Sequence, residues 1–246
     1  MSRQRIIIIG ATSAIAEHCA RLWAQQPGDF VLVGRDRDRL DSLAADLQVR
    51  SPQSSAQSVV LDFSDPAAIA ALAKQTAAEG RVDIVLIAHG NLPVQSDCQQ
   101  DLTLTRQALE INGLSPVLFA EAFVAQLEKA GSGTLAIMGS VAGDRGRKTN
   151  YVYGAAKGLI DRYAQGLQHR FAGTQVKIVL IKPGPTATPM TAHLPPRGLA
   201  RAEDVARRIV AAVAAGQPVV YAPARWWLIM MIIRHLPRIV FNRLNI

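Results

Sequence analysis

Short apolar segments alternate with longer helical patterns along nearly the whole 246-residue chain. The apolar segments are rich in Ile, Val and Leu and are bounded by turn residues, which is typical of strands buried on both faces. This alternation predicts parallel strands joined by crossover helices, and hence a doubly wound α/β sheet with helices on both faces. Seven strands are expected, at residues 6–9, 30–33, 58–61, 84–88, 134–138, 177–181 and 219–221.

Helices are expected between these strands, and one of them has a clear start signal. Asp65 is a suitable N-cap, and Pro66 then occupies the first helical position. No internal repeat is present, so residues 1–222 are expected to form one domain, followed by a separate C-terminal tail at 223–246. The expected helices cover residues 14–26, a segment from 66 onward, and 38–47, 102–129 with a disturbance near 112–116, 151–171 and 203–215.

The cysteines and the N-terminal residues indicate in which cellular compartment the protein is found. Cys19 and Cys98 are the only cysteines, and their spacing fits neither a metal site nor an expected disulfide. Arg3 and Arg5 precede only four isoleucines, which indicate a strand and not a signal peptide. We therefore expect no metal and a cytoplasmic location.

A glycine-containing turn follows the first expected strand and leads into the first helix. It has the sequence Gly10-Ala-Thr-Ser-Ala-Ile-Ala16. The backbone N–H groups and the dipole at such a helix N-terminus favour an anion, and the pyrophosphate of a dinucleotide binds there in Rossmann-like domains. Residues 1–222 are thus predicted to bind a nicotinamide dinucleotide.

Three polar residues could supply chemistry beside that cofactor. Tyr153 and Lys157 are one helical turn apart and share a helix face, and Ser140 precedes the tyrosine by thirteen residues. A free tyrosine has a pKa of about 10, and the Lys157 cation would lower it toward neutrality. Ser140 would donate a hydrogen bond to a carbonyl oxygen as negative charge develops there. Together they could reduce a ketone, with the proton coming from Tyr153, although a Tyr–Lys pair at this spacing alone often arises by chance.

With these motifs, residues 5–222 resemble the short-chain dehydrogenase/reductase family. The glycine turn departs from the family's usual TGxxxGxG, because Ala14 and Ala16 replace the second and third glycines and leave less room beside the phosphates. The family's NNAG segment reads Ile87-Ala-His-Gly90, a further departure. The resemblance implies a structural or cofactor-lining role for His89 and not proton transfer.

The resemblance also implies roles for other residues. Asn112 would order a water molecule beside Lys157, Asp62 would contact the adenine ring, and the segment from Pro183 to Thr188 would line the nicotinamide. Family members commonly form homodimers or homotetramers. The full set implied to contact the cofactor is Gly10, Thr12, Ser13, Ala14, Ile15, Arg35, Asp62, Phe63, Ala88, His89, Gly90, Tyr153, Lys157, Pro183, Gly184, Thr186 and Thr188.

A narrower resemblance rests on five longer sequence segments. These segments resemble those of the decaprenylphosphoryl-2-keto-ribose reductases, which complete the epimerisation that yields a polyprenyl-phosphoryl arabinose. That subgroup implies a keto sugar on a lipid phosphate as substrate and a separate flavin-dependent oxidase as partner. The segments are 10–17, 88–90, 140–147, 151–157 and 181–184.

The choice between NADP and NAD depends on the end of the second strand. Members selective for NAD carry an acid there that binds the ribose 2′-hydroxyl. Here Gly34 occupies that position and Arg35 follows, and a guanidinium could bind a 2′-phosphate bidentately. The sequence favours NADP(H), with NAD(H) as the alternative if Asp36 faces the ribose.

The tail accounts for much of the net charge of +8, and no nucleic-acid motif accompanies that charge. Residues 223–246 contain four arginines and no acid, and their longest apolar run, 226–233, is too short for the roughly twenty residues that span a bilayer. Arg234, Arg238 and Asn242 form a polar stripe on a helix that Pro237 would kink, as in interfacial helices on anionic lipid. The sequence therefore favours peripheral attachment to the inner face of the membrane.

Two other interpretations remain open. In the first, the chain is a soluble carbonyl or 3-oxoacyl reductase whose tail is an oligomer arm. In the second, it is a catalytically idle cofactor-binding scaffold, against which the intact Ser140, Tyr153 and Lys157 argue. Arg145, Arg147 and Lys148 could either meet a substrate phosphate or lie in a solvated loop.

Overall fold

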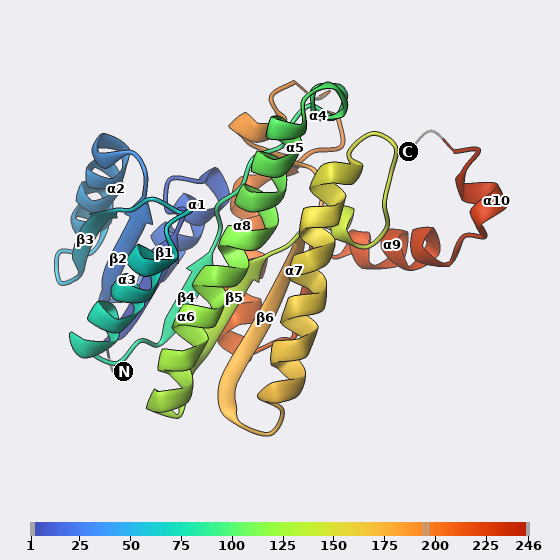
Figure 1. Cartoon of the computed structure of the whole chain (residues 1–246). Helices are drawn as coiled ribbons and strands as arrows, with labels where there is room; N and C mark the ends of the chain where they lie inside the picture. The colour runs from blue at the N-terminus through green and yellow to red at the C-terminus, as the bar shows by residue number, and fades with distance from the viewer. Residues whose placement is uncertain (1–2, 194, 196, 245–246) are drawn as a thin grey trace.

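A computed structural model describes residues 3–193, 195 and 197–244, and a parallel sheet lies at its centre (Figure 1). The seven strands have the order β3-β2-β1-β4-β5-β6-β9, and every pairing between neighbours is parallel. The predicted doubly wound α/β fold is confirmed. The strands are β1 (Gln4–Ile9), β2 (Gly28–Gly34), β3 (Ser55–Val60), β4 (Ile84–Ile87), β5 (Ser132–Met138), β6 (Gln175–Pro183) and β9 (Val219–Ala222).

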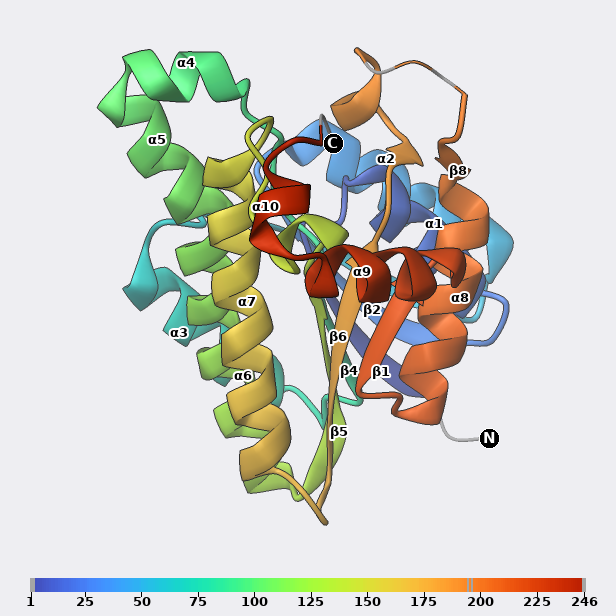
Figure 2. The ribbon, with the colours of Figure 1, turned by 90° about the vertical axis from the view of Figure 1, so that its right-hand side faces the viewer.

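Helices cover both faces of this sheet (Figures 1 and 2). Ile6 and Ile8 of β1 pack on one face against α1, α2 and α8, whereas Ile7 and Ile9 pack on the other against α3, α6 and α7. This two-sided burial explains why the central strands are continuously apolar. The helices are α1 (Ala14–Trp23), α2 (Arg37–Arg50), α3 (Pro66–Ala78), α4 (Gln95–Gln100), α5 (Leu102–Leu109), α6 (Ser115–Ala130), α7 (Tyr151–Arg170), α8 (Ala202–Ala215), α9 (Arg225–His235) and α10 (Arg238–Phe241).

Several element boundaries differ from the prediction. Strand β3 starts at Ser55 and not at residue 58, because pairing with β2 begins at Asp29 and extends into polar sequence at the sheet edge. Helix α4 was not predicted from its polar sequence. The Gln95 Oε1 atom anchors it by accepting a hydrogen bond of 3.0 Å from the Val152 backbone N–H. Between β6 and α8 the chain forms a small two-stranded sheet of β7 (Thr186–Ala187) and β8 (Ala200–Arg201).

The long helical stretch after α4 is interrupted, as predicted, but remains continuous. A π-helical segment at Glu110–Leu114 joins α5 to α6 and holds Asn112 in the interior. Among the described residues, Leu102–Ala130 is the one helix long and apolar enough to cross a membrane by length and composition. Half of its most apolar window is buried, and Phe119 and Phe123 lie in the core beneath the sheet.

The tail forms two helices where the sequence predicted one kinked helix. The break between α9 and α10 falls at Leu236-Pro237 because proline cannot continue the first helix. Helix α9 lies across the β6–β9 end of the molecule (Figure 2). Its Met230 side chain is completely buried against Val141 and Tyr221, so the tail is packed onto the domain.

Candidate active site

The carboxyl ends of four neighbouring strands meet at one edge of the sheet. Gly10 follows β1, the Ala88–Gly90 segment follows β4, Ser140 follows β5, and Gly184 follows β6. In open α/β sheets, ligands bind in the crevice at this edge where the strand order reverses. Parallel pairing therefore brings together motifs that are far apart in the sequence.

Helix α7 carries Tyr153 and Lys157 to this edge. Both residues lie in the first two turns of the helix, and the Lys157 Nζ atom is 5.7 Å from the centre of the Tyr153 ring. The Lys157 ammonium is buried and donates a hydrogen bond of 3.0 Å to the Met138 carbonyl at the end of β5. This bond fixes the ammonium between the helix and the sheet.

Ser140 faces the same tyrosine from a short turn. It caps the 3₁₀ turn Val141–Gly143, and its Oγ accepts a hydrogen bond of 3.1 Å from the Ala142 backbone N–H. The Ser140 side chain also lowers the pKa of Tyr153 and so favours its phenolate. The structure thus brings the three predicted catalytic side chains together.

The pKa of Tyr153 corrects one prediction. Burial raises it to about 12, which outweighs the lowering by the Ser140 side chain. The expected lowering by Lys157 is not found, and burial shifts the lysine itself, lowering its pKa to about 8 against the opposing charge of Asp161. The Lys157 ammonium is directed toward the Met138 carbonyl and is not hydrogen-bonded to the phenol.

Asn112 lies next to this trio because the π-helical segment turns it inward. Its side chain donates to the Ala108 carbonyl at 3.0 Å and accepts from the Asn91 backbone N–H at 2.9 Å. Gly90 packs between Asn112 and Lys157, since a Cβ at this glycine would be 2.8 Å from Asn112 Oδ1 and 3.7 Å from Lys157 Nζ. The fourth predicted catalytic residue is therefore locked beside the lysine.

The glycine turn fits a dinucleotide pyrophosphate. Gly10 has a φ of +78°, and a Cβ there would be 2.6 Å from the His89 backbone nitrogen, so only glycine is accommodated. Ser13 caps the ten-residue helix α1 by accepting from the Ala16 N–H. Ala14 and Ala16 lie inside α1, where none of the described alanines has positive φ, so their replacement of glycine causes no backbone strain.

His89 is a neutral core residue next to this turn. Its Nε2 atom lies 2.9 Å from Ser115 Oγ, which in turn donates to the Phe63 carbonyl at 2.7 Å. The imidazole also makes edge contacts with the rings of Phe63 and Phe119. Burial, together with the charge of Lys157, lowers its pKa to about 3. His89 therefore supports the wall of the site and does not act as a base at neutral pH.

Asp36, Arg35 and Asp62 lie where the adenosine end of the cofactor is expected. The Asp36 carboxylate caps helix α2, where Oδ1 accepts a hydrogen bond of 3.1 Å from the Arg39 N–H. Arg35 is exposed and makes no hydrogen bond or ion pair with any residue that the structure describes. Asp62 accepts hydrogen bonds from the backbone and side chain of Ser64, which lower its pKa, and the Arg35 charge adds a smaller effect.

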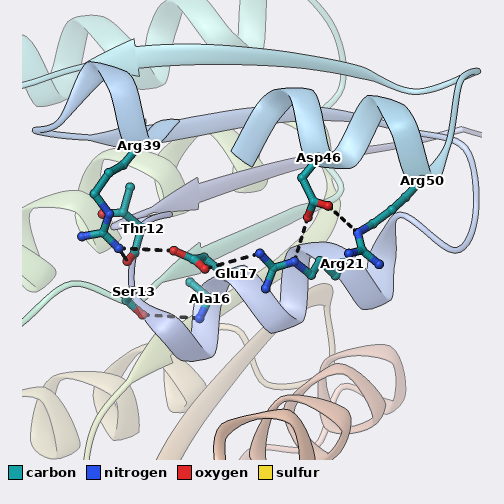
Figure 3. Close-up of polar contacts among 8 residues, drawn as sticks. All are labelled: Thr12, Ser13, Ala16, Glu17, Arg21, Arg39, Asp46 and Arg50. Atoms are coloured by element: carbon teal, nitrogen blue, oxygen red, sulfur yellow. Dashed lines mark hydrogen bonds and ion pairs between the residues drawn. The ribbon is translucent and has the colours of Figure 1, made fainter. Parts of the chain in front are cut away.

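One arginine near the glycine turn was not predicted. The Arg39 guanidinium donates to the Thr12 carbonyl at 2.6 Å and pairs with Glu17 at 3.3 Å (Figure 3). The ion pairs continue from Glu17 through Arg21 to Asp46. In the sequence Arg39 is one of several charged residues in an exposed helix, so only the packing of α2 on α1 identifies it.

The nicotinamide end is covered by the tail. A Cβ at Gly184 would collide with the indole of Trp226, so the first turn of α9 packs directly on the Pro183–Gly184 segment. Thr186 Oγ1 donates to the Gly184 carbonyl at 2.9 Å, and the backbone N–H of Thr188 donates to Thr191 Oγ1. The predicted nicotinamide-lining segment is thus held from both sides.

The suggested phosphate role of Arg145 and Arg147 is not supported by their contacts. Arg145 donates to the carbonyls of Ile233 and Leu236 at the end of α9, at 2.5 and 2.8 Å, and stacks on the Phe241 ring. Arg147 contacts the Met230 sulfur at 3.3 Å. Both arginines attach the tail to the Ser140 turn, and only Lys148 is exposed.

Comparisons with known proteins agree with this geometry. The sequence model of the short chain dehydrogenase family matches residues 4–197. The chain is 31% identical over 245 residues to an "uncharacterized oxidoreductase" of Streptomyces coelicolor, covering 97% of this chain and 95% of that one. A similar match, 31% over 241 residues, covers 97% of this chain and 96% of an oxidoreductase of Mycobacterium tuberculosis.

Solved structures share the fold. A short chain dehydrogenase of Burkholderia cenocepacia, in complex with NADP, superposes with a TM-score of 0.84 at 17% identity, covering 100% of this chain and 98% of that one. One from Sphingobium yanoikuyae, in complex with NADPH, has a TM-score of 0.80 at 22% identity, covering 96% and 97%. Because the family's sequence model extends over most of the chain, the protein belongs to the short-chain dehydrogenase family of oxidoreductases.

Proposed function

We propose that this oxidoreductase uses NADP(H) to reduce a keto group on a sugar carried by a polyprenyl phosphate. The observation that carries the reductase assignment is the meeting of Ser140, Tyr153 and Lys157 beside the Gly10 turn and Gly184. When bound, the nicotinamide would supply the hydride. The chain's own residues must then orient the ketone and deliver a proton to its oxygen.

The three side chains have distinct tasks in this reduction. The Ser140 hydroxyl donates a hydrogen bond to the carbonyl oxygen and stabilises the developing negative charge. The Tyr153 hydroxyl gives its proton to the same oxygen, and the Lys157 ammonium, 5.7 Å from the centre of the Tyr153 ring, is the cation that faces this side chain. Because the pKa of Tyr153 is raised to about 12, its hydroxyl carries the proton throughout the neutral range.

NADP(H) is the cofactor that the adenosine end supports best. Asp36 is engaged as the cap of α2, while Arg35 is exposed at the end of β2. Arg39 adds a second guanidinium close to the glycine turn. The two structural neighbours named above were solved with NADP and with NADPH. The exposed Arg35, with Asp36 engaged as a cap, favours a 2′-phosphate.

Arg35→Asp is expected to lower the preference for NADPH over NADH by at least about tenfold, because a charged hydrogen bond is lost and a repelling charge is added. The measurement is kcat/KM for each cofactor with ethyl acetoacetate as the ketone. Arg37→Asp carries the same change of charge two residues later in the chain, at the first residue of α2, and should leave the ratio unchanged. An unaltered ratio in Arg35→Asp would remove Arg35 from the ribose site.

The tail supports a lipid-linked substrate. Its exposed arginines are Arg225, Arg234, Arg238 and Arg243, and no acid lies in the described part of the tail. Trp227 and Ile232, both more than half exposed, lie on α9 beside them. Apolar side chains with nearby cations suit the headgroup level of an anionic membrane. We place the enzyme in the cytoplasm on the inner membrane face, supplied by a flavin-dependent sugar oxidase.

The substrate assignment is tested by following NADPH consumption with three ketones. The first is a 2-keto-pentofuranose on decaprenyl phosphate in anionic vesicles, the second is its farnesyl phosphate analogue, and the third is ethyl acetoacetate. The proposal expects kcat/KM to be highest for the decaprenyl substrate. Two results together would instead support a soluble carbonyl reductase with an oligomer arm. Turnover of ethyl acetoacetate would equal or exceed that of the decaprenyl substrate, and the assembly would dissociate when the exposed face of α9 is made polar.

A further inference from the structure

A buried cluster of charges lies directly behind the Ser140 turn. The Lys182 ammonium, near the end of β6, is 2.6 Å from Asp161 Oδ2 and also bonds Asp144 Oδ1. Tyr221 on β9 donates a hydrogen bond of 2.9 Å to the other oxygen of Asp144. The three charged side chains are only 5%, 8% and 2% exposed, for Lys182, Asp161 and Asp144 respectively.

This cluster connects the two elements that carry the proposed catalytic groups. Asp144 ends the 3₁₀ turn that begins at Ser140. Asp161 lies on α7 one turn after Lys157, on the helix face that also presents Tyr153. The single ammonium of Lys182 therefore bridges the Ser140 turn and the catalytic helix.

The Ser140 turn packs so closely against α7 that only glycine fits at the points of contact. A Cβ at Gly143 would be 2.8 Å from the Lys157 carbonyl carbon and 3.1 Å from Asp161 Oδ2. A Cβ at Gly139, on the other side of Ser140, would be 3.3 Å from Asp161 Oδ1. Asp161 thus packs close to Gly139, just before the serine, and to Gly143, at the end of the 3₁₀ turn that the serine caps.

Such a cluster contributes more to orientation than to stability. Taking charges out of water costs free energy, and a buried ion pair often stabilises a fold no better than apolar residues of the same volume. Here the cost is visible in Asp161, because burial raises its pKa to about 6 even though Lys182 opposes the shift. Directional bonds from one ammonium to two separate elements, however, set the distance between those elements.

We infer that Lys182, Asp144 and Asp161 are positioning residues that fix Ser140 against Tyr153 and Lys157, with Asp161 also supplying negative charge beside Lys157. The inference rests on the proposed function, because it concerns the same three catalytic side chains. Ser140 and Tyr153 lie on different elements, and a shift of about 1 Å between reacting groups can lower a rate about 10²-fold. We call Lys182, Asp144 and Asp161 the clamp. Substitutions in the clamp are therefore expected to change kcat and not cofactor binding.

Asp161→Asn tests the electrostatic part of this role through the pH profile. The groups that face Lys157 are Tyr153 and Asp161 on α7 and His89 after β4, and Lys182, Asp144 and Tyr221 lie beyond Asp161. The Asp161 charge raises the pKa of Lys157, which burial has lowered to about 8. Removing that charge should lower the pKa further. Reduction needs the Lys157 ammonium, so the alkaline limb of the pH profile of kcat should move to lower pH. The kcat value itself should fall about 30-fold.

Asp144→Asn tests the positional part separately. Asp144 is not among the groups that shift the pKa of Lys157, so kcat should fall while the alkaline limb stays in place. The triple variant Asp144→Asn, Asp161→Asn, Lys182→Met leaves no buried charge unpaired, and it keeps the test possible if a single variant fails to fold. It should keep an unfolding midpoint near wild type and have reduced kcat. Lys177→Met, on the exposed side of β6, is the matched control.

Each variant is measured for NADPH affinity by fluorescence, for thermal unfolding and for kcat with ethyl acetoacetate. NADPH affinity within about threefold of wild type, with a lowered kcat, supports the clamp. A kcat within about threefold of wild type in the folded Asp161→Asn or triple variant, with an unmoved alkaline limb, would overturn it. Tyr153→Phe in the same assay separates the two claims, because an active Tyr153→Phe contradicts the proposed function, whereas an inactive one beside a fully active Asp161→Asn contradicts only the clamp.

Discussion

Tyr153→Phe is expected to lower kcat for ketone reduction by at least about 10³-fold, within the range attributed to a single general acid. The substitution removes the hydroxyl that is the proposed proton donor and whose pKa the Ser140 side chain lowers. The ring remains in place, and Lys157 keeps its hydrogen bond to the Met138 carbonyl. NADPH affinity, measured by fluorescence, should therefore stay close to wild type.

Tyr151→Phe provides the matched control for this experiment. Tyr151 lies two residues earlier at the start of α7 and is 44% exposed, so the same loss of a hydroxyl should leave turnover unchanged. Both variants should unfold at nearly the wild-type temperature. If Tyr153→Phe retains turnover within about tenfold of wild type, Tyr153 is not the proton donor and the proposed mechanism fails.

Replacing Arg234, Arg238 and Arg243 together with Gln is expected to weaken binding to anionic vesicles by about 100-fold. Each arginine near a negatively charged membrane surface contributes about 1 kcal/mol, and the three effects should add. The three side chains are exposed, so the fold should not change. Co-sedimentation with vesicles containing phosphatidylglycerol, at low and high salt, provides the measurement.

The control replaces Arg37, Arg50 and Arg81 with Gln, which removes the same net charge from exposed positions outside the tail. This control should bind vesicles like wild type. If wild-type protein does not bind vesicles at low salt, the membrane proposal fails. Light scattering would then show whether the apolar face of α9 holds subunits together.

The structure changes how the tail should be tested. Because all seven main strands precede residue 223, the sequence predicts that the domain folds without the tail. Met230, however, is completely buried against Tyr221 and Val141, and Arg145 bonds the carbonyls at the end of α9. A chain ending at Pro223 would expose these groups beside Ser140. Substitutions on the exposed face of α9 therefore separate membrane binding from catalysis, whereas truncation does not.

The architecture and the main candidates for the site can be predicted from local sequence patterns alone. Short continuous apolar runs bounded by turn residues are typical of strands covered on both faces, and helices that alternate with them predict crossover connections in a parallel sheet. The spacing of Tyr153 and Lys157 places them on one helix face whatever the tertiary context. The Gly10 turn is equally local, because its positive φ and the start of α1 depend on adjacent residues.

Tertiary structure decided the contacts between elements that the sequence leaves independent. Arg145 and Arg147 resemble phosphate ligands in the sequence, but the packing of α9 assigns them to the tail. Lys182, Asp144 and Asp161 are ordinary charged residues until β6, the Ser140 turn and α7 meet around them. Burial likewise reversed the expected direction of the Tyr153 pKa shift. Desolvation and long-range ion pairing depend on which surfaces close over a group, and local sequence patterns carry no information about that.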